Sequence, residues 1–361
     1  MSFAPNPIER LARARSDLRM GVPVVIAGEE SAVVFAAETL TERRWRNALV
    51  QLDEPLLAIT VWRADTLRAR AYDGDLARVK IPKKAKIDWM RSIADPAFDL
   101  EIPLKGPIRT EREGSADLHR AAIKLVKSAR LLPAAIVFPV PNAWTFSSIN
   151  DLTAVELDSL GMVDEPRVMT DIVRARLPLE VSEAGQLHVF RPDDGGEEHY
   201  AIEIGQPPRD KPVLSRLHSA CFTGDLLGSL KCDCGPQLRG ALRHMGDEGH
   251  GVLLYLNQEG RGIGLANKMR AYSLQDQGFD TVEANHRLGF EDDERDFRIG
   301  ATILKTMGFS AVRLMTNNPA KVARMEENDI TVAERVPLRV GENRHNAHYL
   351  KVKASKSGHL L

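Results

Sequence analysis

Strand-like apolar runs alternate with helical patterns through the second half of the chain, and this alternation constrains the fold more than any other feature. Apolar runs predict strands at 186–190, 199–204, 213–217, 251–256 and 311–315. Helical spacing occurs at 237–245, 265–275 and 299–307. Such alternation is typical of an α/β domain, and the chain has no internal repeat.

The first half also mixes helices and strands. Asn6 can cap a helix that has Pro7 in its first turn and ends at Gly21. Strands are predicted at 22–27, 32–37, 56–62 and 134–140, and a helix at 116–132. A turn-rich stretch near 142–151 and a helix-like segment to about Val173 separate the halves. We therefore expect two α/β domains, mixed α+β in parts, at 1–170 and 174–361.

Charge and hydropathy exclude several classes of partner. The 361 residues include 49 Lys and Arg against 50 Asp and Glu, so no net field attracts nucleic acid or anionic lipid. A basic run at 80–86 is either a solvated loop or a nucleic-acid patch, and no aromatic stacking platform accompanies it. The start lacks the apolar region of a signal peptide, and no apolar run is long enough to cross a membrane. We expect a cytoplasmic enzyme or binding protein that contacts neither nucleic acid nor membrane.

All three cysteines of the chain are clustered, at Cys221, Cys232 and Cys234. Three thiols cannot all pair within one chain, and cysteines separated by one residue are strained as a disulfide, so we do not expect a secreted disulfide framework. Zinc is the natural occupant of closely spaced thiolates, and three protein ligands leave an open position, as catalytic zinc sites do. A structural site closed by His218 or His286 is the alternative.

A glycine-rich segment, NQEGRGIGLANK at 257–268, follows the strand at 251–256 and opens a helix. Gly260, Gly262 and Gly264 permit close backbone approach to a phosphate, and Arg261 can add a bidentate contact. Taken alone, the segment is either such a cradle or an ordinary turn.

Two further polar segments follow. EDDERDF at 291–297 is either a solvated helix start or a carboxylate and guanidinium pair for proton transfer and phosphate binding. RLMTNNPAKV at 313–322 places Thr316 at a strand end and Lys321 in the next helical turn, where α/β folds place a ligand crevice.

The residues from about Arg174 onward resemble the GTP cyclohydrolase II family. The matching stretches, in the family's order and spacing, are RLHSAC, TGD, SLKCDCG, QEGRGIGL, AYSLQDQG, DTVEANHRLGF, DERDF and LMTNNPAKV. The resemblance implies hydrolysis of GTP to 2,5-diamino-6-(5-phosphoribosylamino)pyrimidin-4-one, formate and pyrophosphate, in riboflavin biosynthesis. A GTP-binding regulator with structural zinc and a related cyclohydrolase with another product are the alternatives.

The resemblance also implies a role for individual residues. Cys221, Cys232 and Cys234 would hold one zinc ion, whose bound water attacks C8 of the guanine ring, and Tyr272 would act near the base. Asp293 matches the proton acceptor. Arg295 matches the nucleophile toward the α-phosphate, with electrostatic stabilisation as the alternative because a guanidinium pKa exceeds about 12. The positions that match GTP contacts are Arg216, Leu217, His218, Ser219, Ala220, Gln237, Glu259, Gly260, Arg261, Thr281, Thr316 and Lys321. Mg²⁺ would accompany the triphosphate, and we expect a homodimer.

The sequence departs from the family at three positions. Leu217 and Ala220 lie in a stretch where the family usually reads Arg-Val-His-Ser-Glu-Cys, so a carboxylate beside the first cysteine is missing. Asn257 replaces a residue that is commonly basic. These changes could weaken nucleotide or metal affinity, but the proposed ligands and catalytic positions are present.

The first half more faintly resembles 3,4-dihydroxy-2-butanone-4-phosphate synthase, at 17–41 and 117–140. The long acidic run of that family is shortened to Gly-Glu-Glu-Ser at 28–31, its Gly-His-Thr-Glu-Ala reads Asp-Leu-His-Arg-Ala at 117–121, and a catalytic glutamate falls on Pro139. Without those carboxylates Mg²⁺ has too few oxygen ligands. We expect this half to lack synthase activity and to be a folded scaffold, dimerisation surface or regulator.

Overall fold

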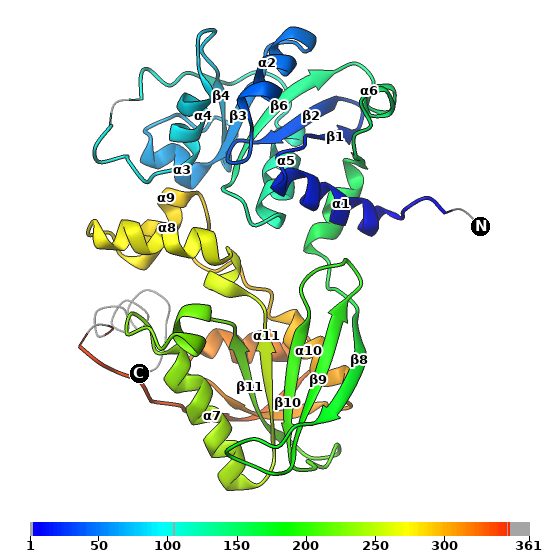
Figure 1. Cartoon of the computed structure of the whole chain (residues 1–361), viewed down its shortest axis with the longest axis vertical. Helices are drawn as coiled ribbons and strands as arrows, with labels where there is room; N and C mark the ends of the chain where they lie inside the picture. Colours follow the sequence, from blue (N-terminus) through cyan, green and yellow to red (C-terminus); the bar gives the residue numbers. More distant parts are fainter. Residues whose placement is uncertain (1–2, 104, 345, 347–361) are drawn as a thin grey trace. The chain divides into compact units, whose positions relative to one another are not determined.

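The computed structural model describes residues 3–103, 105–344 and 346, which form two compact units. Unit 1 comprises Met1–Glu165 together with Ala266–Glu294, and unit 2 comprises Pro166–Leu265 together with Arg295–Leu361. Each unit combines one seven-stranded sheet with helices, which confirms the predicted fold class (Figure 1). The assignment of 1–170 and 174–361 to two functional domains stays a proposal.

The sheet of unit 1 has the strand order β5-β4-β3-β6-β2-β1-β7. Its strands pair antiparallel, except that β1 and β7 run parallel. Their bounds are β1 (Val24–Ala27), β2 (Ser31–Ala36), β3 (Leu56–Thr60), β4 (Leu76–Lys80), β5 (Thr110–Glu111), β6 (Ala134–Val140) and β7 (Ala154–Glu156).

Helices cover the sheet of unit 1. Asn6 and Glu9 form a capping box at the start of α1 (Pro7–Arg19), which confirms the predicted cap. Helices α1 and α5 (Asp117–Ser128) bury Leu11, Leu18 and Leu125 against the strands. The remaining helices of unit 1 are α2 (Glu42–Gln51), α3 (Val61–Thr66), α4 (Ile87–Ala94), α6 (Ala143–Asn150), the 3₁₀ helix η1 (Asp158–Asp164) and α9 (Thr281–Leu288), with α8 (Leu265–Asp276) from its second residue on.

The sheet of unit 2 has the order β14-β13-β11-β12-β10-β9-β8, and the four strands β11 to β14 run parallel. Their carboxyl ends therefore meet at one edge. The bounds are β8 (Met169–Arg176), β9 (Gly185–Pro192), β10 (His199–Ile204), β11 (Val213–Ser219), β12 (Gly251–Leu256), β13 (Ala311–Met315) and β14 (Thr331–Val336).

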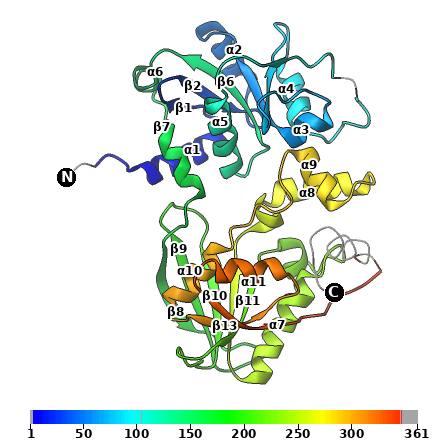
Figure 2. The same ribbon diagram turned by 180° about the vertical axis from the view of Figure 1, so that it is seen from behind.

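Helices lie on both faces of this sheet (Figures 1 and 2). Helix α7 (Cys234–Glu248) packs with Leu253, whereas α10 (Arg298–Thr306) and α11 (Pro319–Glu326) pack with Leu254. Neighbouring strand residues point to opposite faces, so one apolar strand serves both layers. The chain leaves β11 toward α7 and leaves β13 toward α11, and these helices pack on opposite faces of the sheet; α/β folds place ligand sites at the carboxyl ends of such adjacent strands.

The expected helix-like segment up to Val173 is confirmed only at η1 and is wrong beyond it, where the chain forms strand β8, which includes Val173. The stretch at 142–151, expected to be rich in turns, contains helix α6. Pro166 disfavours a helical conformation at the residue before it, and the β-branched residues of Met169–Arg176 pair along β9.

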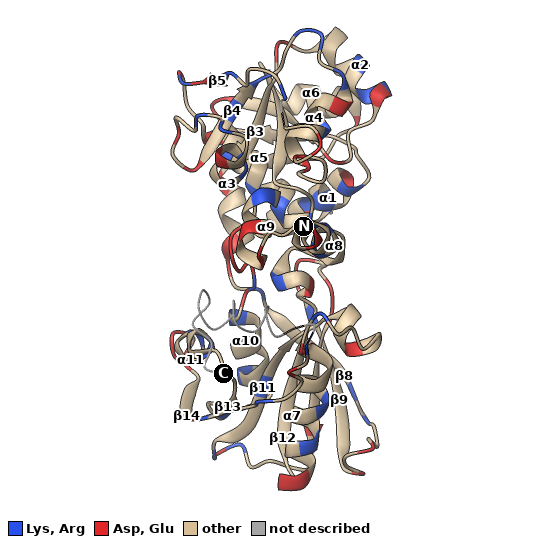
Figure 3. Cartoon of the chain, turned by 90° about the vertical axis from the view of Figure 1, so that its left-hand side faces the viewer, with Lys and Arg blue, Asp and Glu red and all other residues tan. Residues whose placement is uncertain are grey.

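Lys and Arg residues are interspersed with Asp and Glu residues along the elements of each unit, as the colours of Figure 3 show. The near-neutral net charge of −1 thus reflects mixing of both signs along the chain. Among the helices of the described residues, none has the length and apolar character needed to cross a bilayer.

Candidate functional site

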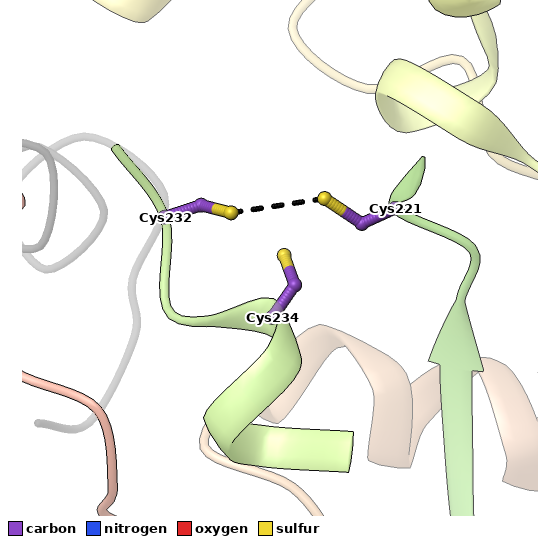
Figure 4. A group of neighbouring side chains, drawn as sticks. All are labelled: Cys221, Cys232 and Cys234. Atoms are coloured by element: carbon purple, nitrogen blue, oxygen red, sulfur yellow. Dashed lines mark hydrogen bonds between the residues drawn. The ribbon is translucent and has the colours of Figure 1, made fainter. Parts of the chain in front are cut away.

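The three cysteines converge beyond the carboxyl end of β11. Cys221 follows that strand, Cys232 lies in a loop, and Cys234 begins α7 (Figure 4). Their sulfur atoms all lie within 4.8 Å of one another, and the Sγ atoms of Cys221 and Cys232 are 3.7 Å apart. Within the described ranges, no other group of three His, Cys, Asp or Glu side chains has metal-binding spacing.

The surroundings of the thiols fit a soft divalent cation. Hydrogen bonding to the thiol of Cys221, then to that of Cys232, and burial together raise the pKa of Cys234 well above its usual value. Three adjacent thiolates repel one another, and a bound cation removes that penalty. Zinc accepts such thiolate ligands at about 2.3 Å, so the residues present fit this metal.

Two glycines allow the cysteine loop to pack this closely. A Cβ at Gly224 would come within 2.6 Å of Cys232 Sγ and 3.1 Å of Cys221 Sγ. A Cβ at Gly235 would approach the carbonyl oxygen of Gly224 to 2.2 Å. Any side chain at either position would thus displace the loop that carries the thiols.

Neither candidate fourth ligand belongs to the cysteine cluster. His218 Nε2 lies 3.0 Å from Asp225 Oδ2, and burial lowers the pKa of His218 although Asp225 opposes this shift. His286 lies in unit 1, where its ring stacks on Trp62 at 4.0 Å and its Nε2 pairs with Asp292. The arrangement favours a metal site with three protein ligands and one open position.

A buried carboxylate, Asp225, organises this part of the site. It accepts hydrogen bonds from the Cys221 backbone N at 2.9 Å and the Tyr255 hydroxyl at 3.1 Å, besides contacting His218. Burial, followed by the charge of Asp225, raises the pKa of Tyr255. Asp225 was not among the site residues predicted from the sequence. The sequence feature that could have indicated it is the TGD stretch between Cys221 and Cys232.

The segment after β12 reaches back to the cysteine loop. Glu259 accepts hydrogen bonds from the backbone N of Phe222 at 2.6 Å and of Gly260 at 2.9 Å. Gly260 and Arg261 both adopt left-handed backbone conformations, with φ of 64° and 60°. Such a conformation costs an arginine roughly 1 kcal/mol or more, and backbone strain of this kind clusters at functional sites.

Predicted nucleotide contacts on β11 meet predicted contacts on α7 and α11. The Lys321 Nζ donates to the carbonyl oxygen of Leu217 at 2.8 Å. Buried Arg216 donates to the Met315 carbonyl oxygen at 3.1 Å and to the side chain of Gln237. Burial lowers the pKa of Arg216 to about 10, so it stays a cation at neutral pH.

The ends of β13 and β11 contribute further predicted residues. Thr316 is buried and accepts a hydrogen bond from the backbone N of Asn318 at 3.0 Å. Ala220 continues β11, its N donating to the Leu256 carbonyl oxygen at 2.8 Å. Arg295 Nη1 lies 3.5 Å from the Ser219 Oγ.

Three predicted site residues belong to unit 1 instead. Tyr272 lies on α8, with the Lys268 Nζ 5.6 Å from its ring centroid. Thr281 begins α9, and its hydroxyl accepts from Gln275 at 3.2 Å. Asp293 lies in the exposed segment after α9. The predicted catalytic and GTP-binding roles of all these residues remain proposals.

Unit 1 has a cavity of about 820 Å³ where the synthase resemblance loses its acidic residues. Its lining includes the shortened run at 28–31 and Asp117, together with Glu156 and Asp158. Pro139, which stands where that family has a glutamate, lies near the carboxyl end of β6 and is paired with Ala32 of β2. The expected loss of synthase activity stays a prediction.

A family model and several curated proteins that resemble this chain all point to the same family. The family model described as GTP cyclohydrolase II matches residues 170–337. A GTP cyclohydrolase-2 from Azospirillum brasilense is 43% identical over 360 residues, covering 97% of this chain and 93% of its own length. A GTP cyclohydrolase-2 from Escherichia fergusonii is 60% identical over 166 residues, covering 46% of this chain and 84% of its own length.

A further GTP cyclohydrolase-2, from Actinobacillus succinogenes, is 54% identical over 190 residues, 53% of this chain and 87% of its own length. The solved structure of a two-domain 3,4-dihydroxy-2-butanone 4-phosphate synthase from A. baumannii covers 93% of this chain and 100% of its own, at a TM-score of 0.32 and 15% identity. That likeness is too distant to carry an argument. The Azospirillum protein matches both units, whereas the Escherichia protein matches under half of this chain.

Proposed function

The chain belongs to the GTP cyclohydrolase II family, and from this premise we propose that it opens the guanine ring of GTP at a zinc site formed by Cys221, Cys232 and Cys234. The products would be 2,5-diamino-6-(5-phosphoribosylamino)pyrimidin-4-one, formate and pyrophosphate, in riboflavin biosynthesis. The observation that carries the proposal is the convergence of three sulfur atoms within 4.8 Å in a chain of this family. The family recognised from the sequence is confirmed.

A bound metal would explain why thiols gather here. Held by Cys221, Cys232 and Cys234, a zinc ion would lower the pKa of a water at its open position and so supply a nucleophile at neutral pH. Asp225 holds the Cys221 backbone, and Gly224 leaves room for the sulfur atoms. These residues therefore keep the ligands at fixed positions, as a catalytic metal site requires.

Cationic side chains at the strand ends would bind the oxygen atoms of the triphosphate, which would carry its own Mg²⁺. Arg216 is buried, and its Nε has no hydrogen-bond partner among the described residues, which supports an anionic ligand beside it. Lys321 and Arg261 lie on segments that follow the neighbouring parallel strands. Gln237 and Thr316 would contribute neutral hydrogen bonds to the nucleotide.

We assign Arg295 to electrostatic stabilisation at the α-phosphate. A guanidinium pKa above about 12 leaves no free electron pair at neutral pH, which disfavours a covalent role. Its position beside Ser219, another proposed GTP contact, supports phosphate binding. Asp293 would accept a proton and Tyr272 would act near the base, as the family resemblance implies.

We further propose a cytoplasmic homodimer in which unit 1 has no synthase activity. Its apolar side chains on α1 and α5 form one buried cluster with the strands, which supports a folded scaffold. Its cavity has the shortened acidic run at 28–31 in its lining.

The test is product formation from GTP and Mg²⁺ by the zinc-loaded protein. We expect formate, pyrophosphate and the diaminopyrimidine in equal amounts, and zinc-loaded protein that yields none would refute the proposal. Cys232→Ser should lose both zinc and ring opening, because two thiolates bind the ion far more weakly than three. Full activity of zinc-free Cys232→Ser protein would defeat the metal-water mechanism.

Ala220 favours one other function, that of a GTP-binding regulator. The missing carboxylate lies directly before the first zinc ligand. Calorimetry with GTP separates the two functions, since a regulator binds GTP without releasing formate. Mass spectrometry of the product identifies a related cyclohydrolase that stops at another compound.

A further inference from the structure

A segment within the cyclohydrolase region of the sequence is built into unit 1. Residues Ala266–Glu294, with nearly all of α8 and the whole of α9, cluster with Met1–Glu165, although the family model spans 170–337. The segment carries Tyr272, Thr281 and Asp293. Three proposed site residues are therefore held by contacts with the N-terminal part of the chain.

Arg270 is the main polar anchor of α8. Its Nη2 donates to Glu38 Oε1 at 2.9 Å and its Nε to Asp95 Oδ2 at 3.1 Å. Its Nη1 also donates to Asn267 Oδ1 at 2.7 Å, and the fully buried Asn267 donates to the Arg130 carbonyl oxygen at 3.0 Å. Two carboxylates from separate segments thus fix the helix two residues before Tyr272.

Helix α9 is anchored through the end of β3 and the start of α3. The Trp62 ring stacks on His286 with ring planes 9° apart. The Thr60 hydroxyl donates to the Gly289 carbonyl oxygen at 2.8 Å, and buried Arg63 donates to the carbonyl oxygen of Arg287 at 3.4 Å. Gly289 has φ of 88°, and a Cβ there would lie 2.9 Å from Thr60 Oγ1, so this contact needs glycine.

The far end of the segment has its own anchor. The Lys127 Nζ pairs with Glu294 Oε1 at 2.8 Å, and both side chains are less than a quarter exposed, at 23% and 20%. Glu294 follows Asp293 directly. The segment is therefore held at both helices and at its carboxyl end, and partly buried ion pairs of this kind resist screening by salt.

We infer that unit 1 is a positioning device for helices α8 and α9, and that Arg270 is the positioning residue that holds Tyr272 and the segment in place for catalysis. This inference rests on the proposed function. It gives the N-terminal half a role without synthase chemistry. Small errors in the placement of reacting groups reduce turnover strongly, so loss of the anchor reduces kcat.

The experiment compares three substitutions in the full-length, zinc-loaded chain. Arg270→Ala removes both ion pairs, and Arg270→Lys keeps the charge. Arg120→Ala is the matched control, because Arg120 also pairs with two carboxylates of unit 1, Asp75 and Asp117, and its described contacts lie outside the α8–α9 segment.

For Arg270→Ala we expect amide exchange in peptides from 266–294 to accelerate about 10-fold, while peptides around the three cysteines stay unchanged. We expect kcat to fall about 10- to 100-fold with unchanged bound zinc, and Arg270→Lys to recover part of the loss. Arg120→Ala should alter neither quantity. If Arg270→Ala unfolds unit 1, Glu38→Gln provides the same test with a smaller perturbation.

Each outcome decides the inference. Unchanged exchange in 266–294, or faster exchange with wild-type kcat, would overturn it. A wild-type chain without GTP turnover would instead refute the proposed function. An active wild type with an unaffected Arg270→Ala variant refutes only the positioning role, so the two failures are distinguishable.

Discussion

Gly224→Ala tests whether the cysteine loop is shaped around a metal ion. The added Cβ would lie 2.6 Å from Cys232 Sγ, whereas unstrained contacts begin near 3.5 Å, so one atom must move by about 0.9 Å. Zinc sites tolerate about 0.2 Å in ligand distance. Overpacking of this kind costs about 1–3 kcal/mol, which corresponds to a loss of about 5- to 150-fold in zinc affinity if the whole cost falls on the metal-bound form.

The assay is competition for zinc between the protein and a chromophoric chelator. Gly240→Ala is the control, because its Cβ would lie 3.4 Å from Val340 and it replaces a glycine inside α7. That change should leave zinc affinity unchanged and stabilise the helix by up to about 1 kcal/mol. Wild-type zinc affinity in Gly224→Ala would refute the steric argument.

Two other changes probe stability. Asp225→Asn removes the carboxylate that accepts hydrogen bonds from Cys221 and Tyr255, and it leaves one acceptor oxygen for three donors. We expect the free energy of unfolding, measured by urea denaturation, to fall by about 1–3 kcal/mol. An unchanged urea midpoint would contradict this expectation. Burial, assisted by the charge of Arg78, lowers the pKa of His119 to about 4. Because the folded pKa lies below the unfolded value of about 6.5, this group stabilises the fold above pH 6.5 and loses that contribution as the pH falls toward 4. The pKa of His119 can be measured by NMR, and a value near 6.5 would show this reasoning to be wrong. A His119→Gln variant whose stability falls with acid as much as that of the wild type would do the same.

Features encoded by neighbouring residues could be predicted from the sequence. The cap at Asn6, the apolar strand at 251–256 and the helix that follows Pro319 each depend on residues close in the chain. The cysteine cluster was also predictable, because thiols are rare here and their spacing limits how far apart they can lie.

Features that depend on distant residues could not be predicted. Strand β8 forms because β9 offers a pairing edge, which local helical spacing does not reveal. The attachment of α8 to Glu38 and Asp95 joins residues more than 170 positions apart. In the sequence, Asp225 is indistinguishable from an ordinary carboxylate in a turn. Its structural role appears only in the fold, where Cys221, Tyr255 and His218 all hydrogen-bond to it.

Unit 1 is formed from two separate stretches of the chain, and this affects how it folds during synthesis. The ribosome must make His286, Arg287 and Glu294 before Trp62, Arg63 and Lys127, respectively, can contact them. During that interval the nascent chain already contains β8 to β12, so strands of the second sheet are present while the first unit still lacks two helices. A pause in translation near codon 265 would lengthen this interval, in which the unpaired surface of α3 is available to chaperones.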